Sequence, residues 1–294
     1  MATRIWQDVD SNWTNTANWS GATVPVAGDT VRILNGNKNI TTNVDQSAVN
    51  ITYLVVGPDF AGTIGTPTTP LKIGTATSIL LNTPKCTSLN LWPSSCTTCI
   101  VSDTHENTYA CNLIDGDFTT LIIDKAKSCI LGAALNIANS GLLSIGYLNN
   151  MLTDSFVTIE SGFTLGTSAT IRQLGGSVVC RAAAHTIDIH AGNWRHEGDT
   201  NYNITTLTLR HPMANFLWNS LGGTLSQAYV YGGILDGSGN GSAKTLTNAE
   251  VWSGGTIDLK NNVNSITVSN PIVVRGTGVV KGDGIRTITL SGSY

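Results

Sequence analysis

The sequence predicts an all-β chain that folds as a single-domain parallel β-helix, a β-solenoid with coils of roughly 20–24 residues and a Trp-rich N-terminal cap. Three observations predict it: polar and apolar residues alternate along short segments, helical periodicity is almost absent, and the segments recur at a regular pitch. A β-sandwich is the alternative fold, because its strands also follow one another at short intervals.

The alternating segments have the period-two pattern of a strand with one face in solvent. The clearest of them cover residues 186–190, 206–210, 256–260, 265–268 and 287–290. The apolar phase is expected to face the interior, and the predicted core comprises Ile187, Leu207, Ile257, Ile266 and Ile288. The polar phase is expected to face solvent, and it comprises Thr186, Thr206, Thr208, Thr256 and Thr267.

Equivalent positions recur after 20 residues from Ile187 to Leu207 and after 22 residues from Ile266 to Ile288. Glycine pairs precede several of the expected strands: Gly175-Gly176, Gly222-Gly223, Gly232-Gly233 and Gly254-Gly255. Corners of a solenoid often need a positive φ, which glycine adopts without steric cost. The pairs therefore mark the expected corners.

One continuous domain is predicted, without a linker, in three consecutive segments. Residues 1–45 form a Trp-rich capping segment, residues 46–150 form irregular coils with a Cys/Pro/Thr-rich insertion, and residues 151–294 form regular coils. The exposed end of a solenoid must be covered, and Trp6, Trp13 and Trp19 are the candidates for this cap. A sugar-stacking platform is the alternative role for these indoles.

Composition excludes several classes of partner. Only 12% of residues are charged and the formal net charge is −3, so we expect no nucleic-acid partner, which would require a basic stripe or tail. No apolar run approaches the length of a transmembrane helix, so we expect no membrane partner. The first eight residues lack the pattern of a signal peptide, so we expect synthesis in a cytosol.

Acidic residues provide the only candidates for catalysis, since glycosidases and lyases use paired carboxylates. The candidates are Asp115 with Asp117, and Asp188 with Glu197 and Asp199. Neither group stands beside the basic residues that such enzymes use, and Asp115-Gly116-Asp117 is equally typical of a turn. We therefore predict no enzyme activity, no catalytic residue and no cofactor.

Cysteine and histidine show no convincing metal-ligand spacing. Cys96 and Cys99 form a lone C-x-x-C pair, and their neighbours Cys86 and Cys111 lie at irregular distances, so buried thiols are expected instead of a metal site. His185, His190, His196 and His211 cluster in one stretch, where a solvated surface is the simplest account. Residues 232–241 predict a corner loop, because the nonapeptide of a calcium-binding β-roll does not repeat.

The N-terminal pattern carries a resemblance. Ile5-Trp6, Asn12-Trp13, Asn18-Trp19, Val24-Pro25 and the run Gly28 to Ile33 resemble the opening of a family of β-helical proteins, found in tailed-phage virions and in bacterial surface and passenger proteins. Residues 156–162 and 169–176 resemble the coils of such phage proteins. The missing signal peptide favours the phage members.

This resemblance implies a non-enzymatic structural protein of a phage virion, of the capsid decoration type, assembled in the host cytoplasm. Its partners would be the major capsid protein or other virion proteins, and it would form a homo-oligomer such as a trimer. One alternative is a tailspike or fibre that binds or cleaves host polysaccharide, with Trp194, Trp218 and Trp252 as candidate glycan contacts. A bacterial surface adhesin is the further alternative.

Overall fold

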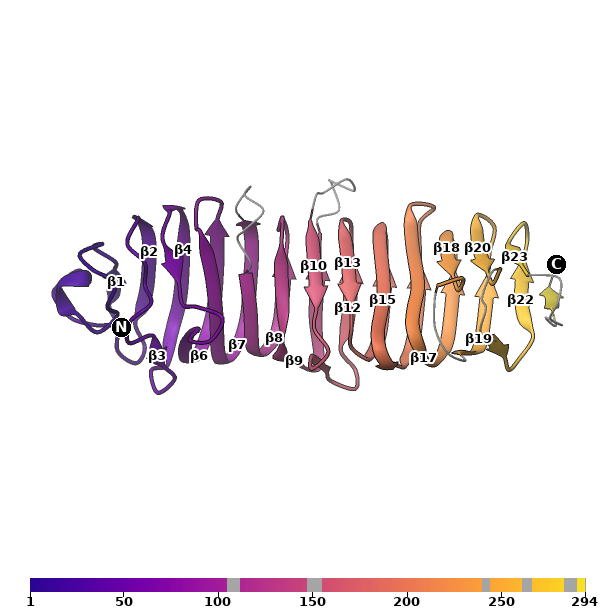
Figure 1. The fold of residues 1–294 in the computed structure, drawn as a ribbon, viewed down its shortest axis with the longest axis horizontal. Coiled ribbons are helices and arrows are strands. Elements are labelled where there is room, and N and C mark those ends of the chain that lie inside the picture. The colour runs from indigo at the N-terminus through magenta and orange to yellow at the C-terminus, as the bar shows by residue number, and fades with distance from the viewer. Residues whose placement is uncertain (105–111, 147–154, 240–243, 261–265, 283–289, 294) are drawn as a thin grey trace.

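The protein is a β-solenoid of about 10 turns, which confirms the predicted fold class. The computed structural model describes residues 1–104, 112–146, 155–239, 244–260, 266–282 and 290–293. The molecule is elongated, and the two ends of the chain lie at opposite ends of the rod (Figure 1). Every pairing between the named strands is parallel, as expected when each coil lies on the previous one.

One stack of strands, stack I, runs the whole length of the rod. Each member pairs with its counterpart in the next coil, for example Ile187 with Leu207 and Val230 with Val251. The members are β1 (Thr3–Ile5), β2 (Thr30–Gly36), β4 (Ile51–Phe60), β6 (Leu71–Thr83), β7 (Ser88–Thr104), β8 (Asn112–Ile123), β9 (Cys129–Ile145), β12 (Thr170–Gln173), β14 (Ala184–Ile189), β16 (Ile204–Leu209), β17 (Ala214–Val230), β19 (Lys244–Val251), β22 (Ile272–Arg275) and β24 (Leu290–Ser293).

A second stack, stack II, includes the first parts of the long strands β8, β9 and β17. Its other members are β10 (Phe156–Ile159), β13 (Ser177–Cys180), β15 (Gly192–Asn201), β18 (Gly233–Asp236), β20 (Gly255–Asp258) and β23 (Val279–Lys281). Four short strands each pair with one strand of a neighbouring coil: β3 (Asp45–Gln46), β5 (Thr63–Ile64), β11 (Thr164–Leu165) and β21 (Ile266–Val268). The described residues contain one 3-10 helix, η1 (Thr16–Asn18).

The interior is one continuous apolar core built from the inward phase of the strands. Ile187, Leu207 and Ile257 are fully buried and Ile266 is nearly so, in agreement with the alternation of the sequence. Ile288 lies outside the described residues. Burying such a side chain contributes about 1.5–3 kcal/mol, so the repeated ladder is the main source of stability.

On the outward phase, Thr186, Thr206 and Thr256 are partly exposed and Thr267 is exposed. Thr208 is different, since it is only 8% exposed, so the expectation of a solvated position is wrong there. Thr208 pairs with Asp188 in the preceding coil and with Tyr229 in the next. Both neighbours have longer side chains, which cover the short hydroxyl between them.

The glycine pairs lie at corners, as predicted. Gly176, Gly223, Gly233 and Gly254 have φ values of 73°, 114°, 77° and 89°. At Gly233 a Cβ atom would also collide with the carbonyl oxygen of Ala214 in the preceding coil. Glycine is therefore required at this corner for both backbone conformation and close approach.

Residues 88–104, expected within the irregular insertion, form the continuous strand β7, which pairs with β6 from Leu71–Leu91 to Thr83–Thr104. Cys96 and Cys99 are buried free thiols, as are Cys86 and Cys180, and Cys129 is also buried. Burial raises the pKa of Cys96 to about 12, so this thiol stays protonated and unreactive. Cys111 lies outside the described residues.

Candidate functional site

The N-terminal layer, residues 1–29, covers the first end of the apolar interior. Trp6, Trp13 and Trp19 are each 1% exposed and belong to the same core cluster as Val31 and Ile33. Trp19 lies edge-on to both other indoles, with ring centroids 5.2 Å from Trp6 and 4.8 Å from Trp13. Its Nε1 donates to the carbonyl oxygen of Trp13 at 2.7 Å. These indoles are enclosed, so the alternative of a sugar-stacking platform is wrong.

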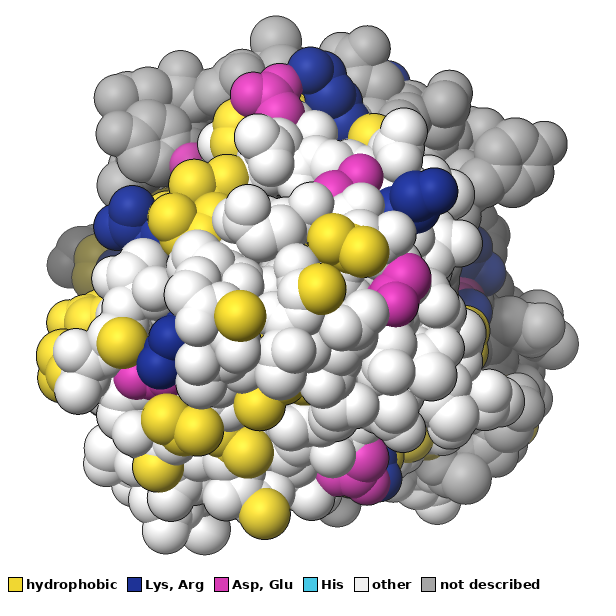
Figure 2. All heavy atoms as spheres, turned by 90° about the vertical axis from the view of Figure 1, so that its left-hand side faces the viewer, with side chains coloured by type: hydrophobic (Ala, Val, Ile, Leu, Met, Phe, Trp, Pro, Cys, Tyr) yellow, Lys and Arg dark blue, Asp and Glu magenta, His cyan; other side chains and the backbone are white. Residues whose placement is uncertain are grey.

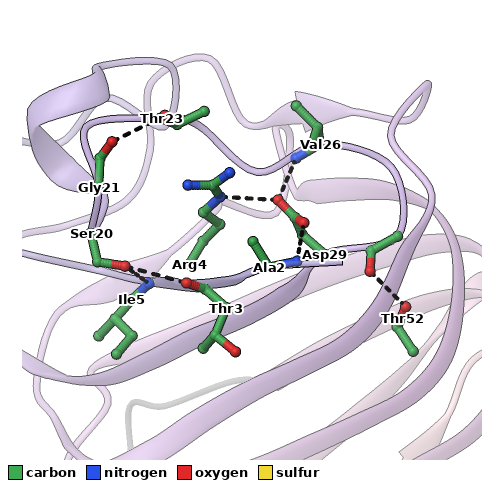
Figure 3. A network of polar contacts seen from close by, with 11 residues as sticks. Ala2, Thr3, Arg4, Ile5, Ser20, Gly21, Thr23, Val26, Asp29 and Thr52 are labelled. Atoms are coloured by element: carbon green, nitrogen blue, oxygen red, sulfur yellow. Dashed lines mark hydrogen bonds and ion pairs between the residues drawn. The ribbon is translucent and has the colours of Figure 1, made fainter.

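A buried carboxylate holds the first residues of this layer against its last residues (Figure 3). Asp29 accepts hydrogen bonds from the Ala2 N–H at 2.7 Å, from Nε of Arg4 at 3.0 Å and from the Val26 N–H at 3.3 Å. Burial by itself raises the pKa of Asp29, but these hydrogen bonds outweigh burial and leave the pKa below its usual value. Asp29 is therefore held as a charged anchor for the chain terminus.

Seen from the N-terminal end, the surface consists mostly of backbone and of side chains that are neither hydrophobic nor charged, with apolar and charged groups in small separate areas (Figure 2). The large apolar side chains exposed in this layer are those of Met1, Val9 and Val26. Scattered apolar groups of this kind are normal on a protein surface. The layer thus closes the interior without creating an extended apolar patch.

Two of the three candidate glycan contacts lie inside the solenoid. Trp194 and Trp218 are only 1% and 2% exposed, and Trp218 donates from Nε1 to Oγ of Ser220 at 3.0 Å. No sugar can stack on an enclosed indole, so the prediction of glycan contact is wrong for both. Trp252, the third, follows β19 and is partly exposed.

The same part of the interior contains two buried basic side chains. Lys244 donates from Nζ to the carbonyl oxygens of Trp218 and Gly239, and its ammonium lies 5.5 Å from the Trp218 ring centroid. Burial lowers the pKa of Lys244 to about 8. His196 is fully buried, neither ring nitrogen has a hydrogen-bond partner among the described residues, and burial lowers its pKa to about 3. The expectation of a solvated histidine is wrong here.

The outward face of stack I carries a patch of charged and aromatic side chains in two rows, which we call the outer patch. The strand row lies on the strands themselves and comprises Arg172, Asp188, Thr208, Tyr229 and Glu250. The corner row lies two residues further along each coil and comprises His190, Arg210, Tyr231, Trp252 and Arg275. Within each row, consecutive members come from consecutive coils.

The first half of the outer patch is an ion-pair network around Asp188. Its carboxylate lies 3.7 Å from Nε of Arg172 and 3.3 Å from Nε2 of His190, and it accepts a hydrogen bond from Nε of Arg210. Asp188 is itself buried, whereas the arginines are about half exposed. Although Asp188 lies on the polar phase of its strand, it is shielded from solvent by the side chains that pair with it.

The second half is aromatic. The Tyr229 and Tyr231 rings are nearly parallel at 6.2 Å, and Tyr231 lies 5.4 Å from the Trp252 ring. The guanidinium carbon of Arg275 lies 4.8 Å from the centroid of Trp252, and Nε of Arg275 donates to Glu250 at 3.0 Å. Tyr231 is 38% exposed. The result is an ordered row of rings ending in an ion pair.

No family model, curated protein or solved structure matches this chain. Among the described residues, no three His, Cys, Asp or Glu side chains are grouped as a metal site would require. The described part of the chain also contains no helix with the length and hydropathy needed to cross a bilayer.

The candidate catalytic acids are kept apart. Asp188 lies in stack I, whereas Glu197 lies in stack II, where it pairs with Arg181 at 3.1 Å and Arg195 at 2.7 Å. The side chain of Asp199 is not among those described. Asp115 is buried and accepts a hydrogen bond from the Ala134 N–H, whereas Asp117 is exposed. Burial raises the pKa of Asp115.

Sequence reasoning missed Arg210, Tyr231 and Arg275. The signal was present, because these residues and Trp252 follow one another at intervals of 21, 21 and 23 residues. Tyr231 and Arg275 each directly precede a corner glycine, and a single residue separates Trp252 from the corner glycine that follows it. The corner row could have been found by searching the sequence for outward-facing residues that recur once per coil, instead of inward-facing ones.

Proposed function

We propose that this protein is a non-enzymatic structural component of a phage virion, displayed on the particle as a capsid decoration protein. The observation that carries the proposal is the closed N-terminal layer on a continuous parallel rod. Such a rod keeps its backbone hydrogen bonds paired from coil to coil, which suits a protein exposed outside a particle. The separation of Asp188 from Glu197 also supports a role without glycoside hydrolysis.

The partner in this proposal is the major capsid protein or another virion protein, and copies would gather as a homo-oligomer such as a trimer about a symmetry axis. Cryo-electron microscopy of purified particles tests it. Density for a rod of about 10 turns on the capsid is the expected result. Absence of the protein from purified particles, judged by mass spectrometry, would contradict the proposal.

A second candidate function is that of a tailspike or fibre that binds host polysaccharide. The observation in its favour is the partly exposed Trp252 in a row with Tyr231 and Arg275. Density at the tail in place of the capsid would favour this candidate, whereas a bacterial surface location would favour an adhesin.

A further inference from the structure

The outer patch concentrates exposed cations on a chain whose net charge is −3. Three guanidinium groups, those of Arg172, Arg210 and Arg275, stand against the two carboxylates of Asp188 and Glu250. The carboxylates lie deeper, since the two acidic side chains are 9% and 25% exposed, whereas the side chains of Arg172 and Arg210 are 45% and 48% exposed. A ligand approaching from solvent therefore meets guanidinium groups first.

The aromatic half of the patch is held in place before any ligand arrives. Trp252 lies between Tyr231 in the preceding coil and Arg275 in the next. Tyrosine and tryptophan offer large contact areas with few rotatable bonds, so little conformational entropy is lost when they contact a ligand. The phenol hydroxyl of a tyrosine can donate or accept a hydrogen bond, so it can bind the hydroxyl groups of a sugar.

The spacing of the row suits a linear polymer. Coils in a parallel stack are about 4.8 Å apart, so Arg210 and Arg275, three coils apart, flank the two aromatic positions at about 14 Å. A chain lying along the rod axis would meet a guanidinium, then two rings, then a second guanidinium. Guanidinium groups bind carboxylates through two parallel hydrogen bonds, which favours an acidic chain over a neutral one.

We propose that the outer patch binds an acidic polysaccharide with carboxylate groups, laid along the solenoid axis over Arg210, Tyr231 and Trp252. Nucleic acid fits less well, because duplex DNA carries a negative charge about every 1.7 Å along its axis, whereas the two guanidinium groups that flank the aromatic positions are about 14 Å apart. The inference rests on the binding role of the second candidate function and does not depend on where in a particle the protein resides.

Affinity electrophoresis of the purified full-length protein tests this site, with polygalacturonate, neutral dextran and duplex DNA as probes. Polygalacturonate should retard the protein and dextran should not. Tyr231→Ala and Arg210→Gln should each weaken retardation by about tenfold, as for the central contacts of an interface. Tyr53→Ala and Arg32→Gln are matched controls, because both residues are exposed on stack I at the N-terminal side and lie outside the patch. These controls should bind like wild type.

Failure of polygalacturonate to retard the wild type would overturn the proposal, and so would tighter binding to DNA or equal retardation of patch and control variants. Urea midpoints show whether each variant is folded. Tyr231→Phe provides a second measurement, since it keeps the ring and removes only the hydroxyl. If Tyr231→Ala unfolds, unchanged retardation in both Tyr231→Phe and Arg210→Gln would overturn the site. None of these outcomes depends on virion attachment, so the two proposals fail separately.

Discussion

The coils between β14 and β22 contain a similar chemical pair on each side of their wall. Inside, the ammonium of Lys244 lies over Trp218, and outside, the guanidinium of Arg275 lies over Trp252. Inside, the cation depends on two carbonyl oxygens and its pKa falls to about 8. Outside, the cation pairs with Glu250 and remains in contact with water. The comparison shows that burial changes the partners of the cation, which are carbonyl oxygens in the interior and a carboxylate and water at the surface.

The largest difference in stability between the inside and the outside of the wall is expected for substitutions at two adjacent residues of one strand. Leu207→Asp would place an unpaired carboxylate in the interior and lower the free energy of unfolding by about 4 kcal/mol or more. Thr206→Asp faces outward and should stay within about 0.5 kcal/mol. Urea midpoints compare the two. Equal shifts would mean that the assigned inward and outward phases are wrong.

The next largest effect is the difference in stability loss between substitutions of Trp218 and Trp252. Trp218→Ala should cost about 3–5 kcal/mol, because it opens a cavity and removes the ring over which Lys244 lies. Trp252→Ala should cost about 1 kcal/mol, because that indole is partly in solvent already. Thermal or urea denaturation measures both losses. A Trp252→Ala loss as large as that of Trp218→Ala would assign Trp252 to the core.

Acid should destabilise the protein through His196. Its pKa is about 3 in the folded protein against 6.5 ordinarily, so the unfolded chain takes up the proton first as the pH falls. Stability is therefore complete above pH 6.5 and is lost progressively towards pH 3, by about 3 kcal/mol at pH 4. His196→Phe should abolish this component and be no less stable at pH 7, since it removes two unpaired nitrogens. Identical acid profiles of the two proteins would refute the assignment.

A smaller effect is expected at alkaline pH through Lys244. Its pKa is about 8 in the folded protein against 10.5 ordinarily, so the folded protein releases the proton first as the pH rises. Stability should therefore increase between pH 8 and pH 10.5, by at most about 3 kcal/mol. Lys244→Met should lack this increase, and Lys260→Met, at an exposed position, is the matched control. A rise that persists in Lys244→Met would point to another group.

Much of stack I was predictable from the sequence because its inward phase is aliphatic and its outward phase is polar. Ile187, Leu207 and Ile257 follow that rule, and Gly233 and Gly254 mark corners through their positive φ. The rule depends on a contrast between the two phases. Where that contrast is present, alternation is sufficient to assign the two faces of a strand.

Stack II was less predictable because its strands lack that contrast. In β15, Trp194 and His196 share the inward phase, and a histidine there looks polar in sequence. In stack I, Lys244 at the start of β19 also departs from the rule, because its ammonium reaches the carbonyl oxygens of Trp218 and Gly239, which sequence spacing does not reveal. At the candidate site, the sequence pointed to Trp252 as an aromatic residue but did not indicate which side chains would lie beside it. Its neighbours Tyr231 and Arg275 come from other coils, so their placement depends on the register between coils.

The parallel register of stack I also determines how the molecule would respond to mechanical force. Each coil is bonded only to the coils beside it, and the hydrogen bonds between coils point along the rod axis. Tension along the axis therefore loads these bonds one coil after another and peels turns from an end. Sideways bending instead loads many coils together. Under axial tension, such a rod would lengthen by the unwinding of single turns.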